Sequence, residues 1–236
     1  MGIDKSQRPS HDIAITHTDW LEANHKPKGT STMKVAIIGA GNVGKALAAS
    51  ITRAGHDVTM SASTPESARE AAASVGASPA DSNVAAVEGA DVVILAVPYA
   101  TVLESIADEI RGATAGRTII DVTNPLRPDY SGLAVEGTSA AEQFQAELPD
   151  ANLIKAFNTV FASNQASPTR DVDAFIAGDD GDAKRQVMEL ADSMGFAPVD
   201  TGALQTARYL EGMAFLNIGL NAANGWAWTS AWKLDR

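Results

Sequence analysis

The segment Lys34-Val-Ala-Ile-Ile-Gly-Ala-Gly-Asn-Val-Gly44 restricts the possible folds most, because a short apolar run passes through three glycines into a helix-forming segment. In this G-x-G-x-x-G pattern Gly39 makes a tight turn, Gly41 lets main chain approach a pyrophosphate, and Gly44 lets the helix pack closely on the strand. The helix N-terminus presents unpaired N–H groups and the positive end of its dipole to phosphates. We therefore predict a dinucleotide site after a strand at Val35–Ile38, and a purely structural glycine turn is the alternative.

Apolar runs alternate with helix-like segments along the rest of the chain. Continuous runs at Asp91–Val97 and Arg117–Thr123 are typical of strands buried on both faces of a parallel sheet. This alternation predicts an α/β chain with a Rossmann-type doubly wound parallel sheet and right-handed crossovers. Further strands are expected at His56–Met60, Ala77–Ala80, Asn152–Phe157, Ala174–Ala177 and Ala197–Val199. Helices are expected at Pro65–Ala73, Val102–Ile110, after the capping box of Ser139 and Glu142, and at Asp182–Met194.

Three parts are expected along the chain. Residues 1–32 form a polar N-terminal extension, whose histidines match no metal-ligand spacing, so we expect no metal. Residues 33–202 form the dinucleotide-binding Rossmann domain. Residues 203–236 form a C-terminal helical segment that is more apolar than one helix face requires. We expect this segment to cover the substrate site or to form a dimer contact, and a homodimer is the expected assembly.

Composition narrows the possible partners. The chain has 236 residues, a net charge of -11 at pH 7 and no cysteine, so disulfides, thiolate catalysis and Cys-ligated metals are excluded. An acidic chain without a basic run argues against nucleic acid and anionic membranes as partners. No segment approaches the roughly 20 apolar residues of a membrane span, and the N-terminus lacks a signal-peptide pattern. We therefore expect a cytoplasmic protein with a small-molecule partner.

The end of the second strand bears on the choice of nucleotide. A site that prefers NAD usually places Asp or Glu there to bond the ribose hydroxyls, whereas this chain has Ser61, Ala62, Ser63 and Thr64. This loop contains no acidic residue that would repel a 2′-phosphate, and the hydroxyls of the loop can donate hydrogen bonds to such a phosphate. The loop therefore favours NADP(H) over NAD, and a solvated serine-rich turn is the alternative.

Three loops after the carboxyl ends of strands should complete the site, because ligands of open α/β sheets bind there. They are Val97-Pro98-Tyr99, Thr123-Asn124-Pro125 and Phe157-Asn158-Thr159. We expect the two prolines to fix the backbone beside the nicotinamide, and Asn124 and Asn158 to offer amides to ribose or carboxamide groups. The alternative is that these are only turn residues.

Groups for acid and base catalysis are scarce near these loops. A dehydrogenase that acts on an alcohol or ketone needs a proton donor beside the reacting oxygen, and Lys155 and Tyr99 are the weak candidates. This scarcity suits hydride transfer between two redox cofactors, because the cofactors bring the reactivity and the protein mainly positions them.

The sequence resembles the F420-dependent NADP oxidoreductases, and also the cytosolic oxidoreductase domain of six-transmembrane ferric reductases. The resemblance covers about Met33 to Trp232. It is carried by Ile38-Gly-Ala-Gly-Asn-Val-Gly44, Leu95-Ala-Val-Pro-Tyr99, Asp121-Val-Thr-Asn-Pro125, Lys155-Ala-Phe-Asn-Thr159, Gly178-Asp-Asp180, Asp200-Thr-Gly-Ala-Leu204 and Ala207-Arg-Tyr-Leu-Glu211.

This resemblance implies roles for particular residues and a hydride passed between NADPH and coenzyme F420 or a flavin lying against the nicotinamide. The residues implied for the pyrophosphate are Ala40, Gly41, Asn42 and Val43; for the 2′-phosphate, Ser61, Ala62, Ser63 and Thr64; and beside the nicotinamide, Val97, Pro98 and Tyr99. The family commonly has Ser-Arg or Arg-Arg in the 2′-phosphate loop, and this chain differs there.

Two other functions are compatible with the same residues. The chain could reduce a small imine or carbonyl compound, with Lys155 or Tyr99 as proton donor. It could also be a non-catalytic module that senses NADP(H), with assembly changing through the Trp-rich C-terminus, because fold does not fix function.

Overall fold

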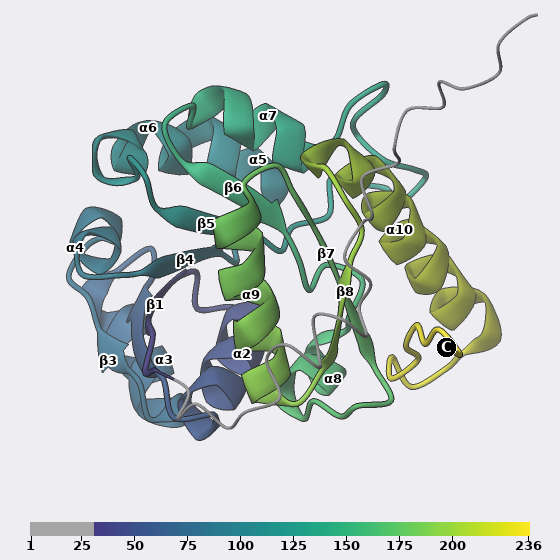
Figure 1. The fold of residues 1–236 in the computed structure, drawn as a ribbon, viewed down its shortest axis with the longest axis horizontal. Helices are drawn as coiled ribbons and strands as arrows, with labels where there is room; N and C mark the ends of the chain where they lie inside the picture. The colour runs from purple at the N-terminus through teal and green to yellow at the C-terminus, as the bar shows by residue number, and fades with distance from the viewer. Residues whose placement is uncertain (1–30) are drawn as a thin grey trace, which may run out of the picture. The chain divides into compact units, whose positions relative to one another are not determined.

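A computed structural model describes residues 31–236 (Figure 1). Residues 1–30 of the expected N-terminal extension, with His11, His17 and His25, lie outside the described residues. The division of the chain into three parts therefore stays a prediction.

An eight-stranded sheet forms the centre of the described chain, in the order β3-β2-β1-β4-β5-β6-β7-β8. The strands are β1 Lys34–Ile38, β2 Asp57–Ser61, β3 Ser78–Pro79, β4 Val92–Leu95, β5 Thr118–Asp121, β6 Asn152–Lys155, β7 Asp173–Gly178 and β8 Ala197–Asp200. The first six strands of this order, from β3 through β1 to β6, run parallel, which confirms the doubly wound Rossmann-type fold.

The last two strands depart from an all-parallel sheet. Strand β7 pairs antiparallel with β6 through Ile154 with Gly178 and Lys155 with Ala177, and β8 runs parallel to β7. Only the final residues of β6 and β7 pair, so the first part of β7 continues beyond the carboxyl end of β6. Helix α10 (Ala207–Asn224) packs on these two strands through Leu210, which lies in a small core with Phe175 and Ala177.

Helices cover both faces of the sheet (Figure 1). Helix α2 contacts α3, α8 and α9 on one face, whereas α6 contacts α4 and α7 on the other. Their bounds are α2 Asn42–Arg53, α3 Pro65–Val75, α4 Asn83–Glu88, α5 Tyr99–Thr101, a π-helical turn η1 Val102–Ile106, α6 Ala107–Ile110, a 3-10 turn η2 Arg111–Ala113, α7 Ala140–Glu147, α8 Ala162–Ala166, α9 Gly181–Met194 and a 3-10 turn η3 Leu204–Thr206.

One hydrophobic core lies between the central strands and the helices α4, α6 and α7. Alternate residues of each strand face this side, among them Ile38, Leu95 and Ile119, where they meet Ile110 and Phe144. Because both faces of the sheet are covered, β4 is apolar throughout and β5 is buried over its whole length, as expected from their sequence runs.

The C-terminal segment is helical only in part. Helix α10 ends at Gly225, whose φ of 63° is in the left-handed region. The chain then returns to the sheet, where the main-chain N–H of Asp173 donates to the carbonyl of Trp232 at 3.0 Å and the Asp173 carboxylate accepts from the N–H of Leu234 at 2.6 Å. The segment from 225 onwards is therefore a strap across β7.

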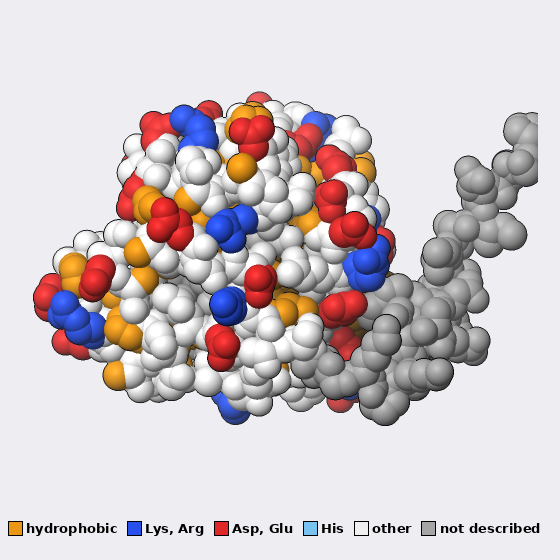
Figure 2. All heavy atoms as spheres, turned by 60° about the vertical axis from the view of Figure 1, so that its left-hand side comes forward, with side chains coloured by type: hydrophobic (Ala, Val, Ile, Leu, Met, Phe, Trp, Pro, Cys, Tyr) orange, Lys and Arg blue, Asp and Glu red, His pale blue; other side chains and the backbone are white. Residues whose placement is uncertain are grey.

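Two further observations concern the described residues as a whole. None of their helices combines the length and hydropathy that crossing a membrane requires. On the face seen in Figure 2, acidic and basic side chains are interspersed over the surface.

Candidate functional site

The glycine turn after β1 is closely packed at its first and third glycines. Gly39 has a φ of +120°, and a Cβ there would lie 2.3 Å from the carbonyl oxygen of Ala96. A Cβ on Gly44 would lie 2.1 Å from the carbonyl oxygen of Gly39. Both distances are far below van der Waals contact, so the turn and the approach of α2 to the sheet depend on glycine at these positions.

Gly41 lies on the open side of the same turn. A Cβ at Gly41 would meet no atom within 4 Å, so the main chain is uncovered there. Gly41 is the N-cap of α2 and provides no side-chain cap, and the first turn of α2 has no acidic residue. Gly41 and Asn42 are exposed, and Ala40 and Val43 are partly exposed. These features leave uncapped N–H groups at the positive end of the helix, an arrangement that fits a pyrophosphate.

The loop after β2 offers fewer hydroxyls than the sequence suggested. Ser61 is buried, and its hydroxyl donates to Asn83 Oδ1 at 2.7 Å, which corrects the expectation that this hydroxyl faces a 2′-phosphate. Thr64 caps helix α3 by accepting a hydrogen bond from the N–H of Ser67 at 3.1 Å. Ser63 is exposed and Ala62 is partly exposed, so these two residues and Thr64 form the surface of the loop.

The turn after β4 places Tyr99 against α7. Its ring stacks on Phe144, with 5.8 Å between ring centroids, and its hydroxyl donates to Gln143 Oε1. Partial burial raises the pKa of the Tyr99 phenol, as does the negative charge of Glu211, so the phenol stays protonated at neutral pH. Val97 is partly exposed and Pro98 is exposed beside it.

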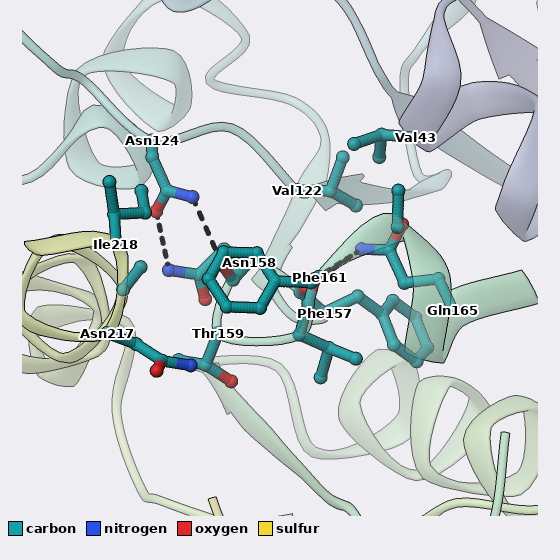
Figure 3. Close-up of a pocket in the computed structure, with 13 residues that line it drawn as sticks. Val43, Val122, Asn124, Phe157, Asn158, Thr159, Phe161, Gln165, Asn217 and Ile218 are labelled. Atoms are coloured by element: carbon teal, nitrogen blue, oxygen red, sulfur yellow. Dashed lines mark hydrogen bonds between the residues drawn. The ribbon is translucent and has the colours of Figure 1, made fainter. Parts of the chain in front are cut away.

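Asn124 and Asn158 lie face to face after β5 and β6 (Figure 3). Asn124 Nδ2 donates to the main-chain oxygen of Asn158 at 3.0 Å, and Asn158 Nδ2 donates to Asn124 Oδ1 at 2.9 Å. Asn158 Nδ2 also donates to the carbonyl of Leu210 in α10 at 3.1 Å. The pair therefore joins two loops of the sheet to the C-terminal helix, whereas Pro125 is buried beside it.

A cavity of about 110 Å³ lies beside the asparagine pair. It reaches from Val43 in α2 past Val122 to α10, where Asn217 and Ile218 line it (Figure 3). None of its lining residues is ionisable. The sequence indicated Val43, Asn124 and Asn158, and it offered the C-terminal segment as a cover of the substrate site, but it did not single out Asn217 or Ile218, whose place at the cavity depends on tertiary structure.

Phe157 holds a rare backbone conformation at the wall of this cavity. Its φ of 60° is in the left-handed region, which a bulky residue seldom adopts. The side chain is fully buried against Phe196, and Gln165 Nε2 donates to the carbonyls of Phe157 and Val160 at 3.1 and 3.0 Å. Strain of this kind gathers at ligand sites, and here it sets the direction of the chain just before Asn158.

Lys155 lies in a buried ionic cluster rather than at an accessible surface. Its Nζ donates to Asp121 Oδ2 at 2.8 Å, to the carbonyl of Thr123 at 2.7 Å and to Glu211 Oε1 at 2.8 Å. All three charged side chains are 0% exposed. Because the three N–H donors of Lys155 are used, its position does not suit the expected role of proton donor.

The cluster explains why a lysine stands at the end of a buried strand. Asp121 and Lys155 are direct neighbours in the pairing of β5 with β6, and Glu211 reaches them from α10. Burial raises the pKa of Glu211, and the charge and hydrogen bond of Lys155 oppose that shift. Asp121 and Glu211 were not singled out for the site from the residues themselves, although both belong to motifs that carry the family resemblance.

Comparisons with known proteins relate the chain to a family of oxidoreductases. Residues 34–125 match the family described as NADP oxidoreductase, coenzyme F420-dependent. The metalloreductase STEAP3 of Rattus norvegicus is 32% identical over 183 residues, which are 75% of this chain and 36% of that protein. The chain therefore spans little more than a third of the length of this curated relative.

Two solved structures resemble the chain over most of its length. The crystal structure of a protein from Arthrobacter sp. FB24, described as a putative F420-dependent NADP-reductase, has a TM-score of 0.78 and 28% identity and covers 86% of this chain and 100% of its own. The hypothetical protein SMa0349 of Sinorhizobium meliloti has a TM-score of 0.65 and 34% identity, over 75% of this chain and 89% of its own.

Proposed function

The chain belongs to the family of coenzyme F420-dependent NADP oxidoreductases, and from this premise we propose that it transfers hydride between NADP(H) and coenzyme F420 or a flavin. The family assignment makes the chain an NADP-dependent oxidoreductase. The nature of the second redox partner, the homodimer and the cytoplasmic location are our proposals.

The N-terminus of α2 supports the nucleotide part of the proposal. The uncovered main chain at Gly41 and Asn42 would hold the pyrophosphate, since N–H groups and the helix dipole both favour an anion. Ser63 and Thr64 would contact the 2′-phosphate, and both residues are exposed. Bound NADPH would supply the hydride, and the chain would supply its orientation.

The main support for hydride transfer between two cofactors is that the candidate proton donors near the strand ends are already engaged in hydrogen bonds within the protein. Lys155 is buried and ion-paired with two carboxylates, and the Tyr99 hydroxyl donates to Gln143. A reaction between two redox cofactors needs no protein acid beside a substrate oxygen, because the donor and acceptor bring the reactive atoms. The chain's task would be to hold two rings in contact and exclude water.

Tyr99 favours one second candidate, the reduction of a small imine or carbonyl compound. Its phenol is partly buried and its raised pKa keeps it protonated, which suits a general acid. In this case Tyr99→Phe should lower turnover by roughly 10²–10⁴ and leave nucleotide binding intact.

The test mixes the purified chain with NADPH or NADH and follows nicotinamide absorbance as F420, FAD, FMN and a panel of carbonyl and imine compounds are added separately. Oxidation of NADPH with F420 or a flavin is the expected result. Oxidation only with a carbonyl or imine compound would favour the second candidate. Tight NADPH binding without any oxidation would contradict both and leave a non-catalytic sensing module.

A further inference from the structure

The buried cluster of Asp121, Lys155 and Glu211 holds more negative than positive charge. Its two carboxylates face one ammonium group, and all three side chains are fully buried. Asp121 Oδ1 accepts from the N–H of Thr123 at 2.7 Å, and both oxygens of Glu211 accept from the N–H of Ala140 at 3.0 and 3.2 Å. Every one of these partners is a donor, so the hydrogen bonds to Glu211 favour its ionised form and oppose the effect of burial, which raises its pKa.

The excess charge lies at the carboxyl ends of β5 and β6, next to the loop proposed to hold the nicotinamide. Thr123, whose carbonyl accepts from Lys155, directly precedes Asn124. The charge also reaches the turn after β4, because partial burial and then the charge of Glu211 raise the pKa of Tyr99. The neighbouring pair of Arg208 and Glu142, which joins α10 to α7 at 2.6 Å, carries no net charge and leaves this imbalance in place.

We infer that the Asp121–Lys155–Glu211 cluster acts electrostatically on the bound nicotinamide and favours its oxidised, cationic form over its reduced, neutral form. This inference rests on the proposed function. NADPH, the acceptor and one proton become NADP⁺ and the reduced acceptor, as the C4–H bond breaks and the acceptor takes the hydride. The nicotinamide ring gains a positive charge in this step, and a buried negative charge nearby stabilises that charge.

The cluster gives the site a preference between oxidised and reduced nicotinamide, which the uncharged residues that line the cavity do not give. The cavity beside Asn124 and Asn158 has no ionisable residue, so an effect on the charge of the ring has to come from behind the loop. Glu211 would be a positioning residue as well, because it ties α10 to α7 through Ala140 and to the sheet through Lys155. Only the electrostatic role distinguishes NADP⁺ from NADPH.

The test compares the dissociation constants of NADP⁺ and NADPH in the full chain and in Glu211→Gln. The glutamine keeps the size and an acceptor oxygen but removes the charge. The expected result is that the ratio of the NADP⁺ constant to the NADPH constant rises on the order of tenfold, because a unit charge acts strongly across a poorly polarisable interior. The matched control is Glu147→Gln, which removes a carboxylate from the exposed C-terminal end of α7 and should leave the ratio within about twofold.

An unchanged ratio in folded Glu211→Gln would overturn the inference, since a merely structural residue would weaken both nucleotides equally. Should this variant fail to fold, Asp121→Asn removes the same excess charge and has the same expected result. Failure of both nucleotides to bind the unmodified chain would instead contradict the proposed function.

Discussion

The side chain of Asn158 donates a hydrogen bond to Asn124 Oδ1 at 2.9 Å, and the main-chain oxygen of Asn158 accepts one from Asn124 Nδ2 at 3.0 Å. Each residue thus fixes the loop of the other at the edge where ligands of open α/β sheets bind. A third bond from Asn158 to the carbonyl of Leu210 extends this restraint to α10. The pair therefore sets the distance between the two loops and the helix that together line the cavity.

Asn158→Ala should weaken NADPH binding roughly tenfold, because it removes the side-chain donor that Asn124 Oδ1 and the carbonyl of Leu210 accept from, and so loosens the two loops and α10. Titration followed by nicotinamide fluorescence measures this change. The matched control is Asn152→Ala, at the opposite end of β6, which should bind NADPH as the unmodified chain does. Equal affinities of the two variants would contradict a role for Asn158 in the site.

Gly41→Val and Gly44→Val should separate binding from folding. Space around Gly41 is open, so valine there should leave the melting temperature nearly unchanged and obstruct the pyrophosphate. Valine at Gly44 would collide with the carbonyl of Gly39, so that variant should lose stability by several kcal/mol or fail to fold. Thermal unfolding and nucleotide titration of both variants test this, and retained binding in folded Gly41→Val would refute the placement of the phosphate.

The sequence predicted the fold best where burial on both faces leaves a continuous apolar run. Strands β1, β4 and β5 agree with their expected runs to within a few residues. The antiparallel direction of β7 was not predictable, because the apolar pattern of a buried strand is the same in either direction. Helices α4 and α8 were missed because five or six residues are too few to show a helical period.

The site was predictable where a local motif determines its geometry. The glycine spacing indicated the tight turn at Gly39 and the close packing of Gly44 on the carbonyl of Gly39, whereas the contact of Gly39 with Ala96 is made by tertiary structure. The partners of Lys155 were not predictable, since Asp121 and Glu211 lie 34 and 56 residues away in the chain. A buried lysine at the end of an apolar strand was the one available signal, because such a charge requires a buried partner.

His56 should make stability depend on pH. The N–H of Met33 donates to its Nδ1 at 3.1 Å, and Nε2 lies 2.9 Å from Ser193 Oγ, which itself donates to the carbonyl of Leu190. Nε2 therefore carries the hydrogen, Nδ1 is an acceptor, and protonation of the ring would break the bond from Met33. Burial lowers the pKa of His56, so the unfolded chain binds the proton more readily than the folded one.

The free energy of unfolding should consequently fall as the pH drops below about 6.5, the ordinary pKa of histidine, and this loss ends at the lowered pKa of the folded state. Chemical denaturation of the unmodified chain and of His56→Gln between pH 7.5 and 5 isolates the effect, because all other titrating groups are common to both proteins. Parallel curves for the two proteins would show that His56 does not contribute.

The outward face of α10 should bind a second copy of the chain. Tyr209, Leu216 and Leu220 follow one another at helical spacing and are 73%, 53% and 38% exposed, so apolar area gathers on one side of this helix. Because the same helix lines the cavity through Asn217 and Ile218, a dimer contact there would also hold the wall of the site in place.

Leu216→Arg should convert a dimer to a monomer, since it places an unpaired charge in the centre of this face. Sedimentation velocity over a range of protein concentrations measures the change. The matched control is Leu234→Arg, another exposed leucine, which lies on the C-terminal strap and should leave the dimer intact. A dimer that survives Leu216→Arg would place the contact elsewhere, and an unmodified chain that stays monomeric would refute the homodimer.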